Sequence, residues 1–324
     1  PGGRQPAGLE RATQNRPPGG ARLRAMLARL QLSMLAASVL AALAWLAWGW
    51  QAGVAPWALA AGTLLALLPT APVLALEFLL LATAGRDAAV PRATAGQLLR
   101  AWAGEVAAAW RVFSRDQPLF ADAEPDVPPA PGRRGVLLVH GYFCNRGVWR
   151  PWLRRLRALG VPCTALTLEP AFGAIDTWVP AIDAAVAALQ QGTGRPPLVV
   201  AHSMGGLAVR TWLAAQPGAA ARVQHVITVG TPHRGTWLAR FGHTRNARQM
   251  RVGGPWLAAL AQREGPAPRT LFTCFHGHAD NIVFPASTAT LPGADNRHLP
   301  AVAHVAMLEH PAVWAEVQRR LTTT

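Results

Sequence analysis

The sequence predicts an α/β protein with a mostly parallel sheet and helices on both faces, preceded by a two-helix transmembrane hairpin. From Gly135 onward, short apolar runs alternate with helix-like segments, which is the order of βαβ units in a parallel sheet. Before that point, two long apolar stretches, residues 32–50 and 57–84, carry only one charged residue, Glu77. Such long uncharged runs are typical of membrane helices.

The composition is apolar and basic. Hydrophobic residues make up 51% and charged residues 15% of the 324-residue chain, and the formal net charge is +15. All 31 basic residues are Arg, and they are scattered along the chain without forming a stripe on one helix. We expect no nucleic-acid partner, because net charge alone governs solubility and loose association. Three Cys residues provide no disulfide framework.

The first 85 residues divide into a basic segment and the hairpin. Residues 1–30 are rich in Arg, Pro and Gly, which indicates disorder. Residues 31–85 form the predicted transmembrane hairpin, with tryptophans clustered around its turn like an aromatic belt. Arg residues flank the opposite ends of the hairpin, so the positive-inside rule places the following domain in the cytoplasm.

Other interpretations of the hairpin stay open. A cleaved signal peptide would explain the first apolar stretch but not the second. A buried helical pair in a soluble core is the other alternative. Pro69 and Pro72 could kink the second helix, which membranes tolerate. Glu77 lies near the cytoplasmic end, where its side chain can reach the interface.

Residues 86–134 are expected to hold an amphipathic helix and a Pro-rich linker. Apolar side chains recur at helical spacing in residues 94–113. This helix lies either on the membrane surface or against the next domain. Pro-rich residues 122–134 predict a boundary, so residues 135–324 form the last domain. We expect its strands at 136–139, 163–168, 197–201, 223–229 and 270–275, and its helices at 148–159, 177–190 and 204–215.

A nucleophile motif lies between the third predicted strand and the helix after it. The string Ala201-His202-Ser203-Met204-Gly205 joins them directly, which is the context of a nucleophile elbow. The sharp turn needs small residues two places before and two places after the serine, and Ala201 and Gly205 satisfy this. We therefore predict Ser203 as a nucleophile, with the dipole of the following helix near a developing oxyanion.

The first predicted strand ends in His140-Gly141-Tyr142. In this position a loop backbone supplies one oxyanion donor, so the N–H groups of Tyr142 and Met204 are the expected pair. His140 precedes the elbow in the chain and more plausibly organises this loop than acts as the base.

The acid and the base are expected after the serine, in that order. Asp280 follows the strand at 270–275, and His304 lies in a loop before the last helix. His304 would accept the proton of Ser203, and Asp280 would hold the imidazole tautomer. The rival acids and histidines are Asp176, Asp183, Asp295, His298 and His310.

A metal site is the alternative use of one of these residues. His276, His278 and Asp280 have the spacing of metal ligands on one strand face, but a metal there would remove the acid from the triad. We predict neither a metal nor another cofactor. Two further segments stay undecided between a structural and a functional role: the Gly-Thr-Pro-His loop at 230–233, and residues 241–262, a small lid or an ordinary packing helix.

Together these strings resemble bacterial lipases and esterases of the α/β-hydrolase superfamily, of the small lid-poor type. The matching segments run in order from Val136 to the C-terminus: the elbow, the Gly-Thr-Pro-His loop, Ala-Asp-Asn-Ile-Val at 279–283 and Val-Ala-His-Val-Ala at 302–306. The resemblance implies hydrolysis of carboxylic esters through an acyl-enzyme. The chain departs from it at Ala303, where the family often has Gly, and in its hairpin, which secreted lipases lack.

The sequence therefore predicts a serine ester hydrolase that acts on lipophilic esters or lipids at a bacterial inner membrane, with its catalytic domain in the cytoplasm. An acyltransferase or thioesterase with the same triad is one alternative. A catalytically inactive, membrane-anchored scaffold is another. Ester or lipid substrate and the membrane are the expected partners, and no protein partner is indicated.

Overall fold

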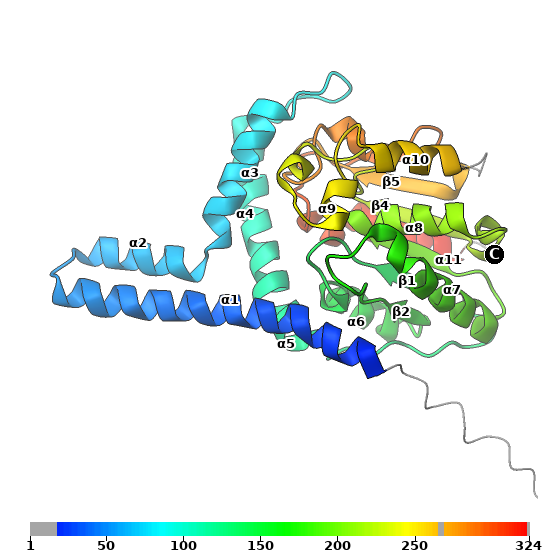
Figure 1. The fold of residues 1–324 in the computed structure, drawn as a ribbon, viewed down its shortest axis with the longest axis horizontal. Coiled ribbons are helices and arrows are strands. Elements are labelled where there is room, and N and C mark those ends of the chain that lie inside the picture. The colour runs from blue at the N-terminus through cyan, green and yellow to red at the C-terminus, as the bar shows by residue number, and fades with distance from the viewer. Residues whose placement is uncertain (1–17, 265–268, 323–324) are drawn as a thin grey trace, which may run out of the picture.

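The computed structural model describes residues 18–264 and 269–322, and the chain forms a sheet domain with a helical arm (Figure 1). The predicted disorder of residues 1–17 lies outside the described residues. Helix α1 (Pro18–Gln51) begins at Pro18, so the remainder of the segment predicted as disordered is helical.

Six parallel strands form the sheet. They are β1 (Val136–Val139), β2 (Cys163–Ala165), β3 (Leu198–His202), β4 (His225–Val229), β5 (Phe272–His276) and β6 (Asp295–His298). Their order is β2-β1-β3-β4-β5-β6, and every neighbouring pair is parallel. The predicted parallel sheet is therefore present. Loops that follow the carboxyl ends of its strands meet at one edge, where sites of open α/β sheets form.

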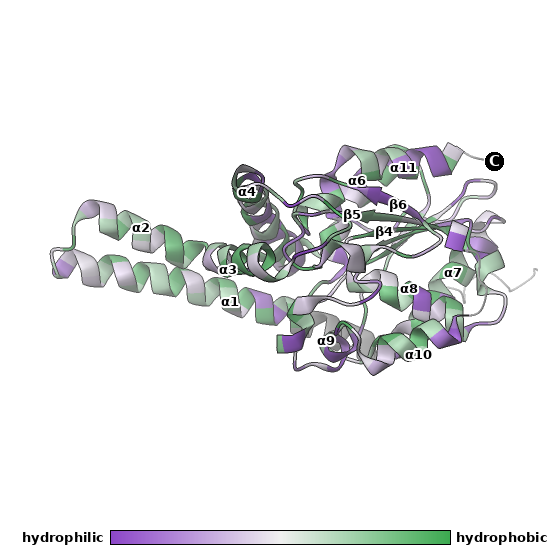
Figure 2. Ribbon diagram, turned by 90° about the horizontal axis from the view of Figure 1, so that it is seen from above, coloured by the Kyte–Doolittle hydropathy of each residue, from purple (hydrophilic) through white to green (hydrophobic). Residues whose placement is uncertain are grey.

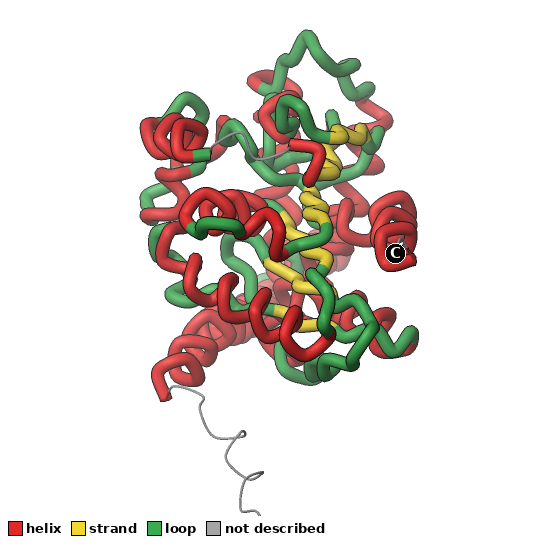
Figure 3. The backbone as a smooth tube through the Cα atoms, turned by 90° about the vertical axis from the view of Figure 1, so that its right-hand side faces the viewer, coloured by secondary structure: helices red, strands yellow, loops and turns green. Residues whose placement is uncertain are grey.

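Helices cover both faces of the sheet (Figure 3). One face packs on α7 (Val179–Thr193), α8 (Met204–Ala215) and α10 (Pro255–Arg263); the other packs on α6 (Arg150–Ala158) and α11 (Pro311–Thr322). Leu137 and Val139 of β1 face the first set, whereas Val136 and Leu138 face the second. This alternation follows from the two-residue period of a strand and fixes which residues reach each layer.

The arm consists of α1 and α2 (Pro56–Leu67), which pack as an antiparallel hairpin and project from the domain (Figures 1 and 2). Within the described residues, one helix, Leu27–Gln51, is long and apolar enough to cross a membrane. The predicted second span is broken: α2 and α3 (Thr70–Ala84) meet at an angle of 77°. The break lies at Leu68 and Pro69, as expected because proline lacks the N–H that would continue a helix.

Helices α3 and α4 (Ala95–Arg111) pack against the sheet domain. Phe78 and Leu81 of α3 and Ala101 of α4 form one buried cluster with Ala279 and Ala303 of the domain. Helix α4 thus packs on the domain, which was one of the two alternatives. Its buried face differs from the apolar face expected from the sequence, because Glu105 is buried whereas Leu99 is 64% exposed.

Residues 112–135 connect α4 to β1. Helix α4 continues into a π-helical turn, Val112–Asp116, and α5 (Gln117–Phe120). The Pro-rich linker then runs along the edge of the sheet, where Val127 bridges Cys163 in antiparallel sense. Helices α3, α4 and α5 therefore pack against the domain, whereas α2 does not.

Candidate active site

Ser203 occupies the turn between β3 and α8. Its φ is 53° and its ψ is −130°, a conformation that non-glycine residues seldom adopt. A Cβ atom added to Gly205 would lie 2.6 Å from the carbonyl oxygens of Val139 and His140. A Cβ atom on Gly141 would lie 2.7 Å from that of Ser203. Both glycines are thus required for β1 and the turn to approach this closely, which places Ser203 beside the loop after β1.

His304 and Asp280 form a buried pair. The Nδ1 atom of His304 lies 3.0 Å from each carboxylate oxygen of Asp280. Asp280 Oδ1 also accepts hydrogen bonds from the N–H groups of Ile282, at 2.9 Å, and Val283, at 2.8 Å. These bonds fix the position of the Asp280 carboxylate, and the carboxylate orients the His304 ring.

The charge around His304 favours its protonated form. Burial alone would lower the pKa of the imidazole, but the Asp280 carboxylate outweighs this and, with Glu105 and Glu77, raises it above the ordinary value. A histidine in such surroundings can take up a proton from a hydroxyl and keep it through one reaction step.

Two neighbours hold the His304 ring against the elbow. The ring of His202 packs on it with 4.7 Å between centroids, and His202 Nε2 lies 3.3 Å from the His304 carbonyl oxygen. Gly230 has a φ of 58°, and a Cβ atom there would lie 3.0 Å from His304 Nδ1. Among the described hydrogen bonds, none joins Ser203 to the His304 ring. Such catalytic contacts often form only when substrate binds.

Backbone N–H groups beside Ser203 are available for an oxyanion. Met204 is the first residue of α8, and the first N–H groups of a helix have no acceptor within it. Tyr142 follows Gly141 and lines the same cavity as Ser203. His140 fixes this loop: its Nε2 accepts from the N–H of Leu168 at 2.9 Å, and burial lowers its pKa to about 4. The ring is therefore neutral, and its Nδ1 donates to the Gly141 oxygen at 2.8 Å.

An apolar cavity of about 280 Å³ contains both Ser203 and His304. Three of its walls come from the N-terminal helices rather than from the sheet domain. Helix α1 supplies Met34, α3 supplies Val73 and Leu74, and α4 supplies Ala109. These side chains give the cavity apolar walls next to the Ser203 hydroxyl.

The segment considered as a lid does not line this cavity. Within the part of the chain that the structure describes, residues 241–262 contribute none of the cavity's lining residues. They form the end of a 3-10 turn (Trp237–Phe241), α9 (Arg245–Gln249) and most of α10. Leu257 and Leu260 of α10 pack into the main core. The segment thus corresponds to the packing alternative.

Three polar residues lie behind His304, and sequence reasoning assigned none of them to this site. Glu77 was expected at the membrane interface, but its side chain bonds Asn281 of the sheet domain instead. Glu105 is 1% exposed and accepts hydrogen bonds from the N–H groups of Val305, at 2.8 Å, and Ala306, at 3.0 Å. Asn281 accepts from the N–H of His304 at 3.3 Å and donates to Glu77 at 2.7 Å. The one available signal was a glutamate in the amphipathic helix, whose burial only the tertiary structure reveals.

Burial raises the pKa of Glu105 to about 7, although its two backbone hydrogen bonds act in the opposite direction. Its negative charge in turn raises the pKa of His304. The side chain does not bond to Ser203 or to the His304 ring; it holds the backbone that follows His304. Glu105 is therefore a positioning residue.

Replacing Glu105 with glutamine should shift the acid limb of the pH profile of kcat/KM to lower pH. Only neutral His304 accepts a proton, so activity is lost as the pH falls through its pKa, which Glu105 raises. The amide keeps one of the two oxygens that accept from the loop N–H groups but removes the charge. Glu124→Gln, which removes the carboxylate that pairs with Arg150 and Arg154, should leave the limb unchanged, because Glu124 does not contribute to the pKa of His304. An acid limb that stays in place in Glu105→Gln would contradict this role.

The rival residues have other partners. Asp176 accepts from Gln249 and Trp256, Asp183 from Trp212 and Arg222, and Asp295 from Arg297. His278 Nδ1 lies 3.0 Å from His298 Nε2, and no group of metal-binding side chains occurs in the described ranges. Cys144 is buried, and burial raises the pKa of its thiol to about 12.

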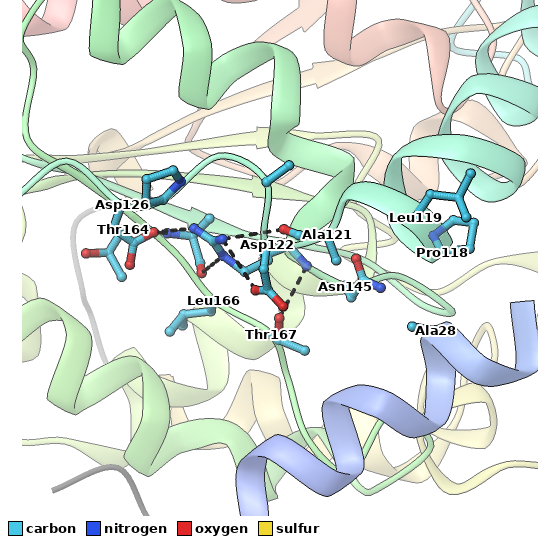
Figure 4. A pocket seen from close by; sticks show the side chains of 14 residues that line it. Ala28, Pro118, Leu119, Ala121, Asp122, Asp126, Asn145, Thr164, Leu166 and Thr167 are labelled. Carbon is cyan, nitrogen blue, oxygen red and sulfur yellow. Dashed lines mark hydrogen bonds and ion pairs between the residues drawn. The ribbon is translucent and has the colours of Figure 1, made fainter. Parts of the chain in front are cut away.

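A second, larger cavity of about 820 Å³ lies beyond the end of β2, between α5 and the N-terminal part of α1 (Figure 4). Arg146 dominates its polar lining, but the guanidinium is fully engaged. It bonds Asp126 at 2.5 Å and the carbonyl oxygens of Ala165 and Glu124 at 3.2 and 3.0 Å. This cavity contains neither Ser203 nor His304.

Comparison with known proteins agrees with this geometry. The sequence model of the alpha/beta hydrolase family matches residues 136–317, which is more than half of the chain. The chain belongs to the alpha/beta hydrolase family. The match covers the sheet domain with Ser203, Asp280 and His304, and it begins after the N-terminal helices.

Solved structures resemble the same part of the chain. Bacillus licheniformis lipase BlEst2 in its mature form has a TM-score of 0.53 at 19% identity, covering 61% of this chain and 96% of that chain. Aspergillus fumigatus lipase B has a TM-score of 0.53 at 21% identity, covering 59% of this chain. The chain matches only 53% of the Aspergillus lipase. Identities this low show the fold alone. No curated protein matches the sequence.

Proposed function

We propose that this alpha/beta hydrolase is a serine ester hydrolase that acts on lipophilic esters at a membrane. One observation carries the proposal: the strained elbow presents Ser203 to an apolar cavity that is also lined by His304, whose ring is paired with the buried Asp280. The lipases with similar folds agree with an ester substrate. The proposed site consists of Ser203, Asp280 and His304, with the N–H groups of Tyr142 and Met204 as the oxyanion hole.

In this mechanism, Ser203 Oγ attacks the ester carbonyl carbon while His304 Nε2 takes the hydroxyl proton. The carbonyl oxygen becomes an oxyanion, held by the N–H groups of Tyr142 and Met204. Asp280 stabilises the imidazolium, which then gives its proton to the departing alcohol. Water attacks the resulting acyl-enzyme, passes a proton to His304, and releases the carboxylic acid together with the free serine.

The cavity favours an apolar acyl group. Its volume of about 280 Å³ and its mostly apolar walls suit a hydrocarbon chain better than a charged one. The Arg residues at 29, 86 and 92, which flank the hairpin, favour a cytoplasmic catalytic domain at a bacterial inner membrane. A thioesterase or an acyltransferase would use the same groups, with a thiol leaving group or an alcohol acceptor.

Labelling with a fluorophosphonate probe tests the nucleophile. We expect one adduct, on the peptide that contains Ser203, and none in the Ser203→Ala variant. Wild-type protein that stays unlabelled, or an adduct on another serine, would refute the proposal. Product analysis of a long-chain p-nitrophenyl ester in water, with and without glycerol, then separates hydrolysis from acyl transfer, because only transfer gives a new ester.

A further inference from the structure

The projecting hairpin is unusually apolar on its outer surface. Helix α2 has no buried residue, and no charged residue occurs between Arg29 and Glu77. Large apolar side chains of the hairpin are exposed: Val39, Leu40, Leu43, Leu46, Trp48, Trp50, Trp57, Leu64, Leu65 and Leu67. An apolar surface of this extent marks an interaction site, and its lack of charge fits hydrocarbon.

The two helices of the hairpin are tightly joined. The indole N–H of Trp45 donates to the Leu59 carbonyl oxygen at 3.1 Å. A Cβ atom on Gly62 would lie 2.3 Å from the Trp45 ring, and one on Gly49 would lie 2.3 Å from Leu59. The small residues thus let the helices approach closely, as they do in membrane helix pairs. The hairpin is a preformed unit.

The length of the hairpin is close to the thickness of one leaflet of a bilayer. Helix α2 has 12 residues and is therefore about 18 Å long, whereas the hydrocarbon core of a bilayer is about 30 Å thick. Helix α3 then turns by 77°, so it lies across the base of the hairpin. A complete crossing would require α3 to sink roughly 12 Å into the hydrocarbon core. Arg86 lies just beyond the end of α3, and moving its charge into hydrocarbon would cost free energy.

Helix α3 is suited to lie in the plane of the membrane surface. Its inner face packs on the domain through Leu74, Phe78 and Leu81. Its outer face exposes Val73, Leu76 and Leu79 by 56, 55 and 60%. Such a helix presents one apolar face to the lipid while its other face is already covered by protein.

The cavity of the candidate active site reaches the base of the hairpin. Met34 of α1 and Val73 of α3 line the cavity and are also 54% and 56% exposed, so they lie at its rim. Thr70, the first residue of α3, lines it as well. The cavity thus opens at the corner where the hairpin leaves the domain.

We propose that the α1–α2 hairpin inserts into a single leaflet, with α3 along its surface, so that a lipid ester passes from that leaflet into the Ser203 cavity. The passage of substrate rests on the function proposed above; the insertion does not. The arrangement differs from the predicted two-span hairpin in the location of its tip, which stays within the bilayer instead of emerging on the far side.

Accessibility of the tip tests the insertion. The three native cysteines are buried, so an Ala52→Cys variant adds one reactive thiol at the turn. The protein is reconstituted into sealed vesicles of phosphatidylcholine and phosphatidylglycerol and treated with a membrane-impermeant maleimide. We expect no labelling from either side and full labelling after detergent is added. A Leu159→Cys variant, on the far side of the domain, reports which side carries the domain.

Two results would overturn the proposal. Labelling of Ala52→Cys only from the side opposite the domain would show a complete crossing. Labelling from the same side as the domain would show a hairpin outside the bilayer. In both cases fluorophosphonate labelling of Ser203 in the same sample reports separately on the proposed enzyme function, so the two hypotheses can fail independently.

Charge on the hairpin provides a second measurement. Leu40→Asp and Leu64→Asp each place a carboxylate on an exposed position of the hairpin, and each should weaken partition into the vesicles by roughly a hundredfold. Leu159→Asp makes the same change on an exposed leucine of the domain and should partition like the wild type. Equal partition of all three variants would contradict insertion.

The entry route can be tested at the rim. Val73→Trp should lower turnover of a long-chain ester presented in vesicles roughly tenfold more than turnover of p-nitrophenyl acetate in solution, because only the long chain must pass the corner. An equal loss for the two substrates would show that lipid enters elsewhere.

Discussion

The Ser203→Ala variant should lose kcat on the order of 10⁴- to 10⁶-fold toward p-nitrophenyl esters. The cavity walls and oxyanion donors stay in place, but no oxygen is left to form the acyl-enzyme, and removal of a serine nucleophile has effects of this size. Turnover is measured under saturating substrate in detergent. Ser33→Ala removes a hydroxyl that bonds only its own helix, so its rate should equal that of the wild type.

A small effect of Ser203→Ala would have a definite meaning. If the variant kept more than about a tenth of the wild-type rate, the activity would come from another group or from general base attack by water. The strained turn would then serve only the packing of β3 against α8.

The Asp280→Asn variant should lose about 10⁴-fold in kcat, because it reverses the tautomer of His304. Oδ1 of Asp280 accepts from the N–H groups of Ile282 and Val283, so the amide oxygen of asparagine would keep this position. Its NH₂ group would then face Nδ1 of His304 as a donor. The ring proton would move to Nε2, which could no longer accept the proton of Ser203.

Asp295→Asn is the matched control for this variant. Asp295 is the first residue of β6 and pairs with Arg297 at the surface, so its replacement should leave kcat within about twofold of the wild type. If Asp280→Asn kept full activity and Asp295→Asn lost it, the assignment of Asp280 as the acid would be wrong.

Local sequence patterns predicted the sheet domain well. Helix α8 has the predicted bounds, 204–215, because the elbow sets its start and the apolar pattern sets its length. Strand β2 ends at Ala165, three residues before the predicted end. Beyond it, the Thr167 hydroxyl accepts a hydrogen bond from the N–H of Arg146, in the loop after β1. Of the three residues predicted in the order Ser203, Asp280 and His304, Asp280 contacts His304, and Ser203 lines the same cavity as His304.

Tertiary contacts determined what the sequence could not predict. Glu105 lies in a helix whose apolar pattern pointed to another face, and only the N–H groups of Val305 and Ala306 explain its burial. The broken second span is similar: Pro69 indicated a kink, but the sequence did not show that α3 turns by 77° and packs against the domain. The cavity walls from α1 and α3 were missed for the same reason, because a motif search finds catalytic groups and not their surroundings.

The hydrogen bond from the Val305 N–H to Glu105 joins residues that are 200 positions apart in the chain, so its two partners are synthesised at very different times. The helices of the arm leave the ribosome first, long before the loop that carries His304. The helices that precede the sheet domain can therefore fold while the candidate active site is still incomplete, and the segment that carries His304 completes it. Under the function proposed above, the enzyme could not cleave a lipid ester until the segment that carries His304 had been synthesised.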